Sequence, residues 1–214
     1  MKILVTGFDP FDKEKINPAY EAVKLLPDEI KGAQIIKAEI PTVFGRCGDE
    51  VERQIIQHNP DVVICVGQAG GRSSISVEKV AINLDEARIP DNEGKQPLDK
   101  AIVPDGPTAY FTNLPIKAMV ENVRLKGIPC SISYTAGTFV CNDVMYRLLH
   151  MINAKYHHIK GGFIHVPFCL QQVVGRTDNV TAWDIRTIAE GLEYAIEAVA
   201  QNKADSGIAL GSTH

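Results

Sequence analysis

Cys141 is the residue whose surroundings in the sequence most favour chemistry. A β-prone run at residues 131–135 leads, through Ala136-Gly137-Thr138, into a segment from about Phe139 in which apolar residues recur at helical spacing. Cys141 is therefore predicted in the first turn of a helix, where unpaired backbone N–H groups and the helix dipole favour the nucleophilic thiolate. Position alone leaves open whether this cysteine is reactive or an inert buried residue.

His165 and Glu78 are the best candidates for a base and its orienting acid. His165 lies near the carboxyl end of an apolar strand, residues 161–168, where ligand sites of open α/β sheets collect. Glu78 falls in an alternating run, residues 75–83, on the same side as two apolar residues, and a carboxylate there needs a cation or donor. If the two converge on Cys141, they can activate it; the alternatives are a core histidine and a salt-bridged glutamate at an edge.

Three loops could supply a binding site. Phe8-Asp9-Pro10-Phe11 follows the first strand, and its two aromatic rings either line a ligand pocket or tuck under the sheet edge. Residues 67–72 are glycine-rich but match neither common phosphate-binding pattern. Residues 84–107 lack periodicity, which is typical of a functional lid or of disorder. Within them, Arg88 and Ile89 could bring a guanidinium and an apolar side chain to the sheet edge, or Arg88 could be simply solvated.

The elements that must position these residues alternate between strands and helices. The continuous apolar run at residues 62–66 indicates a strand buried on both faces. The pattern predicts an α/β fold, a three-layer αβα sandwich with a mostly parallel central sheet, in one domain spanning residues 1–214 with a loose tail from about 203. Strands are expected at residues 2–7, 34–40, 62–66, 75–83, 131–135 and 161–168, and helices at 17–26, 44–58, 113–126, from about 139, and at 182–201, the last with Trp183 on its packing face.

Composition excludes several classes of function. The 214 residues carry a formal net charge of −4, which gives no pull toward nucleic acid or an anionic membrane. No stretch approaches a membrane span and no leader precedes the first strand, so a cytoplasmic protein is expected. Five cysteines, widely spaced and without CxxC or Cys/His clusters, predict reduced thiols and no metal site. No cofactor is expected.

Two long motifs resemble those of the pyroglutamyl peptidase I family, the pyrrolidone-carboxylate peptidases. Residues 67–72 together with 75–83 are similar to its glutamate signature, and residues 133–142 to its cysteine signature. The segments 6–11, 17–18 and 163–167 also match in order, so the resemblance covers nearly the whole chain. The chain departs from the family after Phe11, where Asp12-Lys13-Glu14-Lys15 replaces the usual Gly-Gly. We expect this change to alter access or affinity before activity.

The resemblance implies removal of an amino-terminal pyroglutamate from peptides by a triad of Cys141, His165 and Glu78. It also implies that Arg88 lies near the oxyanion, that no metal or cofactor is used, and that the protein forms a homotetramer. The pyroglutamyl ring is a neutral lactam, so its site needs apolar walls and one or two amide partners. The residues implied to shape that pocket are Phe8, Phe11, Thr42, Gln68, Ile89, Phe139 and Val140.

Two other functions remain open from the sequence. Nucleoside phosphorylases resemble this family in architecture, and the glycine-rich loop could hold phosphate, so a phosphorylase-like transferase is one alternative. A non-enzymatic ligand- or zinc-binding module that uses Cys141, His165 and Glu78 is the other.

Overall fold

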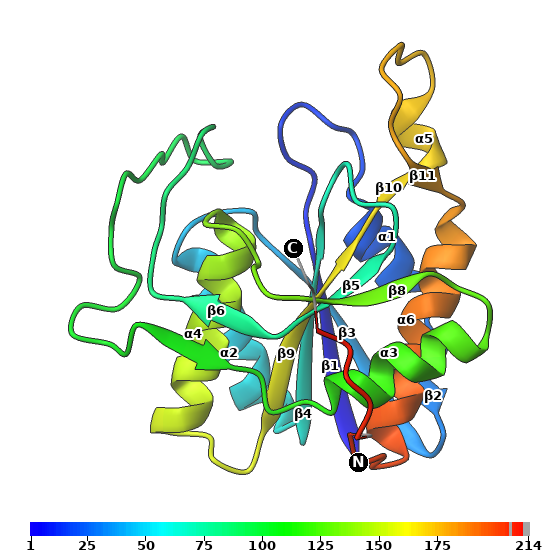
Figure 1. Cartoon of the computed structure of the whole chain (residues 1–214). Coiled ribbons are helices and arrows are strands. Elements are labelled where there is room, and N and C mark those ends of the chain that lie inside the picture. The colour runs from blue at the N-terminus through cyan, green and yellow to red at the C-terminus, as the bar shows by residue number, and fades with distance from the viewer. Residues whose placement is uncertain (206, 212–214) are drawn as a thin grey trace.

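The computed structural model describes residues 1–205 and 207–211 and has helices on both faces of a central sheet (Figure 1). Its strands are β1 (Lys2–Phe8), β2 (Glu29–Ile30), β3 (Ala33–Ile40), β4 (Val62–Gln68), β5 (Ile75–Glu78), β6 (Val80–Ile82), β7 (Ala109–Phe111), β8 (Cys130–Ser133), β9 (Lys160–Val166), β10 (Phe168–Cys169) and β11 (Ala182–Trp183). Its helices are α1 (Pro18–Leu25), α2 (Arg46–His58), α3 (Ile116–Leu125), α4 (Val140–Ala154), α5 (Leu170–Val173) and α6 (Ile185–Ala200).

The central sheet has seven strands in the order β2-β3-β1-β4-β9-β5-β8. β3, β1, β4 and β9 run parallel to one another, and β8 runs parallel to β5. β5 is antiparallel to β9, with Ser76 opposite His165, and β2 is antiparallel to β3, so the strands at both edges run against the four central ones. The predicted mostly parallel αβα sandwich is confirmed.

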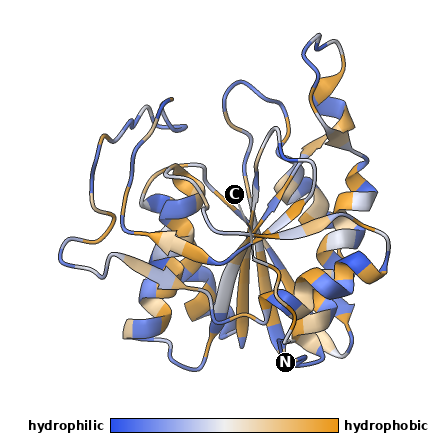
Figure 2. Cartoon of the chain, in the orientation of Figure 1, coloured by the Kyte–Doolittle hydropathy of each residue, from blue (hydrophilic) through white to orange (hydrophobic). Residues whose placement is uncertain are grey.

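Two apolar cores lie on the two faces of the sheet. α1, α3 and α6 pack on one face, and α2 and α4 on the other. Residues 62–66 of β4 are at most 1% exposed, because both layers cover this strand, as its continuous apolar run predicts. Figure 2 shows the same division, with apolar residues in the central strands and on the inward sides of the helices.

The run at residues 75–83 is not one strand. It breaks at Lys79, whose N–H donates to Ser133 O and whose carbonyl accepts from Thr112 N. β6 then leaves the main sheet and pairs antiparallel with β7. Glu78 is therefore the last residue of β5, and the prediction that it continues on one side of a longer strand is wrong.

The last helix begins later than the sequence pattern indicates. Asp184 caps it, since its side chain accepts a hydrogen bond from Arg186 N, and the helix starts at Ile185. Trp183 lies instead in β11, paired with Cys169 of β10. The prediction that Trp183 belongs to the packing face of a helix is wrong.

The start of the C-terminal tail is anchored. Lys203 Nζ donates to Asn122 Oδ1 of α3, and Asp205 Oδ1 accepts from two backbone N–H groups at the start of the same helix. The expected loose tail also includes Ser206 and residues 212–214, which lie outside the described residues. Among the described helices, none is long and apolar enough to cross a membrane.

Candidate active site

Cys141 lies in the first turn of α4, as predicted, directly over β4. A Cβ atom built on Gly67 would come within 2.9 Å of Cys141 Sγ and 2.6 Å of the Phe163 ring, so only glycine fits beneath the sulfur. The neighbouring residue Asn142 is fully buried and fixes the start of the helix. Its Oδ1 accepts from Ile82 N, and its Nδ2 donates to the carbonyl oxygens of Ile82 and Leu84.

Glu78 and His165 meet because their strands are antiparallel neighbours. Glu78 Oε1 lies 2.7 Å from His165 Nδ1, and the two residues are 0% and 4% exposed. A carboxylate only accepts, so Nδ1 carries the proton and Nε2 of the ring is left as an acceptor. This is the arrangement that orients a histidine for use as a base.

Arg72 completes this group, and the sequence analysis did not single it out. Its Nη1 lies 2.7 Å from the same Glu78 oxygen, and its Nη2 donates to Thr135 O. The signal was present, because a buried carboxylate needs a cation. Arg72 stands only six positions before Glu78, but it lies in the glycine-rich loop after β4.

A cavity of about 160 Å³ lies beside Cys141 and His165. A volume of roughly 150 Å³ holds one benzene ring, so this cavity suits a single small ring. Phe139 forms much of the wall and packs edge-on against Phe44, with ring centroids 5.2 Å apart. The lining residues are Phe8, Phe11, Asn17, Thr42, Gln68, Ala136, Phe139, Val140, Cys141 and His165.

Arg88 and Ile89 are not among the residues that line this cavity. Arg88 is exposed, and its backbone oxygen accepts from Gln96 Nε2. The loop that carries both residues is bonded to segments next to the cavity, since Glu86 N donates to Thr138 O and Asn92 N donates to Thr42 O. The expected roles of Arg88 near the oxyanion and of Ile89 in the pocket stay predictions.

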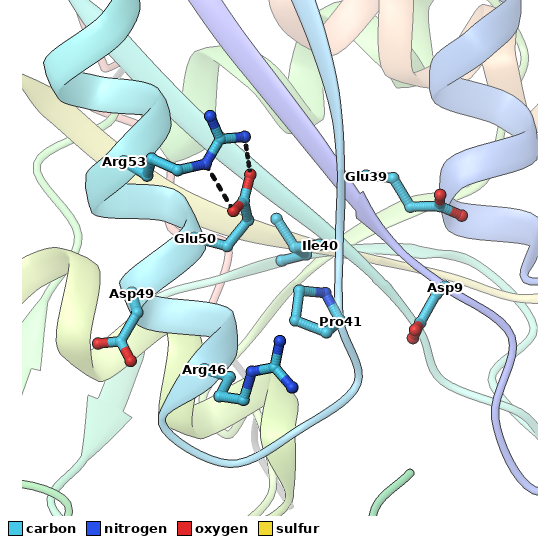
Figure 3. A pocket seen from close by; sticks show the side chains of 8 residues that line it. All are labelled: Asp9, Glu39, Ile40, Pro41, Arg46, Asp49, Glu50 and Arg53. Carbon is cyan, nitrogen blue, oxygen red and sulfur yellow. Dashed lines mark hydrogen bonds and ion pairs between the residues drawn. The ribbon is translucent and has the colours of Figure 1, made fainter. Parts of the chain in front are cut away.

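A larger pocket of about 430 Å³ lies next to Pro41 (Figure 3). Its other lining residues are Asp9, Glu39, Ile40, Arg46, Asp49, Glu50 and Arg53. Some of these charges pair with one another, as Arg53 does with Glu50. It is lined by neither a cysteine nor a histidine, so the smaller cavity beside Cys141 is the candidate active site.

Burial determines the protonation of the resting site. It raises the pKa of the Cys141 thiol to about 12; the charge of Glu78 adds to this rise, and Arg72 opposes it. Burial also lowers the pKa of His165, against the opposing effect of Glu78. The thiol is therefore protonated and the imidazole neutral near pH 7. Desolvation therefore opposes the expected bias toward thiolate at the helix start.

No three His, Cys, Asp or Glu side chains in the described part of the chain are grouped so that they could hold a metal ion. All five cysteines are free thiols, as predicted.

Comparison with known proteins identifies relatives over the whole chain. The family model described as pyroglutamyl peptidase matches residues 1–202. Pyrrolidone-carboxylate peptidase of Enterococcus faecalis is 59% identical over 100% of both chains, and that of Clostridium perfringens is 57% identical over 96% of both.

Solved structures of similar proteins have the same fold. Pyroglutamyl peptidase I from Bacillus amyloliquefaciens superposes with a TM-score of 0.94 at 45% identity, covering 97% of this chain and 99% of that one. A variant of pyrrolidone carboxyl peptidase from Pyrococcus furiosus has a TM-score of 0.90 at 42% identity, covering 95% and 100%. With the family model and these relatives matching almost end to end, the chain belongs to the pyroglutamyl peptidase family.

Proposed function

We infer that the protein is a cysteine exopeptidase that hydrolyses the amide bond after an amino-terminal pyroglutamyl residue. We assign Cys141 as the nucleophile, His165 as the general base and acid, and Glu78 as the residue that orients His165. The observation that carries this assignment is the cavity itself. Cys141 and His165 line one small apolar cavity, while Glu78 Oε1 lies 2.7 Å from His165 Nδ1. The family assignment does not support the nucleoside phosphorylase alternative.

The protonation of the site indicates how the nucleophile is formed. Because the thiol pKa is raised and His165 is neutral, the proton passes from Sγ to His165 Nε2 as the sulfur attacks the pyroglutamyl carbonyl carbon. The C–N bond then breaks, and His165 gives this proton to the leaving amine. Water, deprotonated by His165, cleaves the thioester, releases pyroglutamate and returns the thiol.

Backbone N–H groups at the start of α4 are the best donors for the oxyanion. The first residues of a helix have no intrahelical acceptor for their N–H groups, and the helix dipole favours negative charge there. The N–H of Cys141 already lies beside its own sulfur. The role near the oxyanion that the family resemblance implies for Arg88 is proposed alongside these donors.

The cavity wall suits a neutral ring. Phe8, Phe11, Phe139 and Val140 supply apolar surface, and Thr42 and Gln68 supply polar atoms at its edge. No carboxylate lines the cavity within the described residues, so a cationic amino terminus would enter without a partner, whereas a lactam needs none.

Cys141→Ala tests the function. We expect the release of a chromogenic amine from its pyroglutamyl amide to fall by about 10⁴-fold or more, because the nucleophile is lost. Cys130→Ala is the control, since Cys130 is a free thiol that lies on the edge strand β8 and does not line the cavity. A Cys141→Ala protein that keeps near the parental rate contradicts the mechanism.

We further propose that the 214 residues act as one catalytic domain in the cytoplasm, as a homotetramer, on peptides that begin with pyroglutamate. The family resemblance supports the tetramer. The net charge of −4 supports the absence of nucleic acid and membrane partners. Light scattering of the purified protein measures the oligomeric state.

A further inference from the structure

A chain of hydrogen bonds that begins at the backbone of Cys169 sets the orientation of the Gln68 amide. The N–H of Cys169 can only donate, and it donates to Gln172 Oε1 at 3.2 Å. The Cys169 thiol lies 3.6 Å from the same oxygen. The carbonyl end of the Gln172 amide therefore points at Cys169, and its NH₂ end points away.

The next bond passes this orientation on to the cavity wall. Gln172 Nε2 donates to Gln68 Oε1 at 2.9 Å. Because the carbonyl oxygen of Gln68 accepts this bond, the NH₂ group of Gln68 must lie on the other side of its amide. Gln172 is 8% exposed and Cys169 is fully buried, so this chain is screened from water.

Two other polar side chains of the wall each have a donor engaged. Asn17 Nδ2 and Thr42 Oγ1 both donate to the backbone oxygen of Asp9. Cys141 and His165 are assigned to the chemistry. Within the described part of the chain, the side-chain hydrogen bonds of Gln68 engage only its amide oxygen, so both of its N–H donors remain for a ligand, whereas Asn17 keeps one.

We propose that Gln172 is a positioning residue that holds the Gln68 NH₂ group toward the cavity, where it donates to the lactam oxygen of the pyroglutamyl ring. This inference rests on the proposed function. The scissile carbonyl must lie at the sulfur of Cys141, so the ring oxygen faces a wall that is mostly apolar. A buried carbonyl without a donor costs roughly 1–3 kcal/mol. A proline ring, which has a methylene group at that position, gains nothing from Gln68.

Gln172→Glu should reverse the orientation of the Gln68 amide. A glutamate still accepts from Cys169 N but cannot donate, so Gln68 must turn its NH₂ group toward residue 172 and present its carbonyl to the cavity. We expect about tenfold or more weaker binding of 2-pyrrolidone, a lactam without a scissile bond, and a similar rise in KM, with little change in kcat. Gln172→Met, which leaves both orientations open, should give a smaller loss. Gln171→Glu, with the same charge on an exposed neighbour, should bind 2-pyrrolidone as the parent does.

Two further measurements separate positioning from general damage. In a Gln68→Leu background, Gln172→Glu should weaken 2-pyrrolidone binding by less than about twofold, because the two residues act as one unit. Alkylation of Cys141 by iodoacetamide needs no lactam, so its rate should be unchanged in Gln172→Glu and Gln172→Met.

The proposal is overturned if Gln172→Glu binds 2-pyrrolidone as the parent does, if the loss persists in full in the Gln68→Leu background, or if Cys141 alkylation slows in parallel. A failure of the proposed function is detected by a separate measurement. In that case the parent protein does not cleave a pyroglutamyl amide, whatever the Gln172 variants bind.

Discussion

A single oxygen of Glu78 serves two partners, His165 and Arg72, so these two residues are linked at the level of individual atoms. Glu78 Oε2, by contrast, has no hydrogen-bond partner within the described part of the chain. The positive charge of Arg72 lowers the pKa of His165, and the negative charge of Glu78 raises it. The two neighbours therefore tune the base in opposite directions.

Replacing Arg72 by Met should move the acidic limb of the rate profile to higher pH. Without the guanidinium, the imidazolium is less disfavoured, so the pKa of His165 rises and the neutral base is lost at a higher pH. We expect kcat/KM at pH 7 to fall by about tenfold. The measurement is kcat/KM from pH 5 to 9, with Arg72→Lys expected to restore part of the profile. If the acidic limb of the profile is unchanged in Arg72→Met, Arg72 does not lower the pKa of His165.

Glu78→Gln should move the same limb in the opposite direction. The amide can still accept from His165 Nδ1, but it no longer stabilises the imidazolium, so the pKa of His165 falls. We expect a loss of about 10²- to 10⁴-fold in kcat/KM, smaller than that of Cys141→Ala because the nucleophile remains. Equal losses in two folded variants would mean that Glu78 does more than orient the histidine.

The sequence predicted the candidate nucleophile, base and acid but not their neighbours. Cys141 and His165 stand out because helix starts and strand ends are visible in the hydrophobic pattern. Gln172 could not be found, since its partner is 104 positions away and no local pattern joins them. Arg88 was assigned to the site from the family resemblance alone, because an aperiodic loop has no pattern from which its path could be predicted.

At the scale of secondary-structure elements, the sequence predicted which segments form helices and strands. It predicted less well which strands pair with one another and in which direction. The continuous apolar run of β4 and the apolar periodicity of α4 are enough to predict that these elements are buried. The break at Lys79 depends on the pairing of β6 with β7, and the reversed direction of β5 depends on its neighbour β9. An alternating pattern carries no information about either partner.

A buried pair of carboxyl groups joins the long loop to α4. Burial raises the pKa of Asp85 to about 8, and the nearby Asp143 adds to this rise while Arg147 opposes it. Asp143 itself accepts from Gly45 N and from Arg147 Nε at the start of the helix. At neutral pH Asp85 is therefore mostly protonated.

This pair predicts how stability depends on pH. Asp85 keeps its proton in the folded state up to about pH 8, whereas an unfolded aspartate loses it near pH 4. The contribution of Asp85 to the free energy of unfolding is therefore complete below about pH 4 and is lost as the pH rises toward 8. Asp85→Asn, which has no such proton to lose, should flatten this decline. Urea unfolding at pH 5.5, 7 and 8.5 measures it, with the exposed Asp99→Asn as control. If the free energy of unfolding of Asp85→Asn declines as steeply with pH as that of the parent, Asp85 is not the source of the decline.

At the scale of the whole molecule, the tail joins the end of the chain to its middle. Pro115 precedes α3 and provides no side-chain cap, and Asp205 supplies one from a segment far along the chain. Its Oδ1 accepts from Lys117 N at 2.8 Å and from Ala118 N at 3.2 Å. In Figure 1 the tail runs from the end of α6 across the molecule to the level of the sheet.

Asp205→Ala should lower the free energy of unfolding by about 1 kcal/mol, the usual loss when a helix loses its capping side chain. Asp205→Asn should stay near the parent, because its carbonyl oxygen can accept the same bonds. Neither variant should change kcat/KM, since Asp205 lies outside the cavity of Cys141. Urea unfolding and kcat/KM of both variants measure these effects. Parental stability in Asp205→Ala would mean that the start of α3 is satisfied by solvent and that the tail does not support the fold.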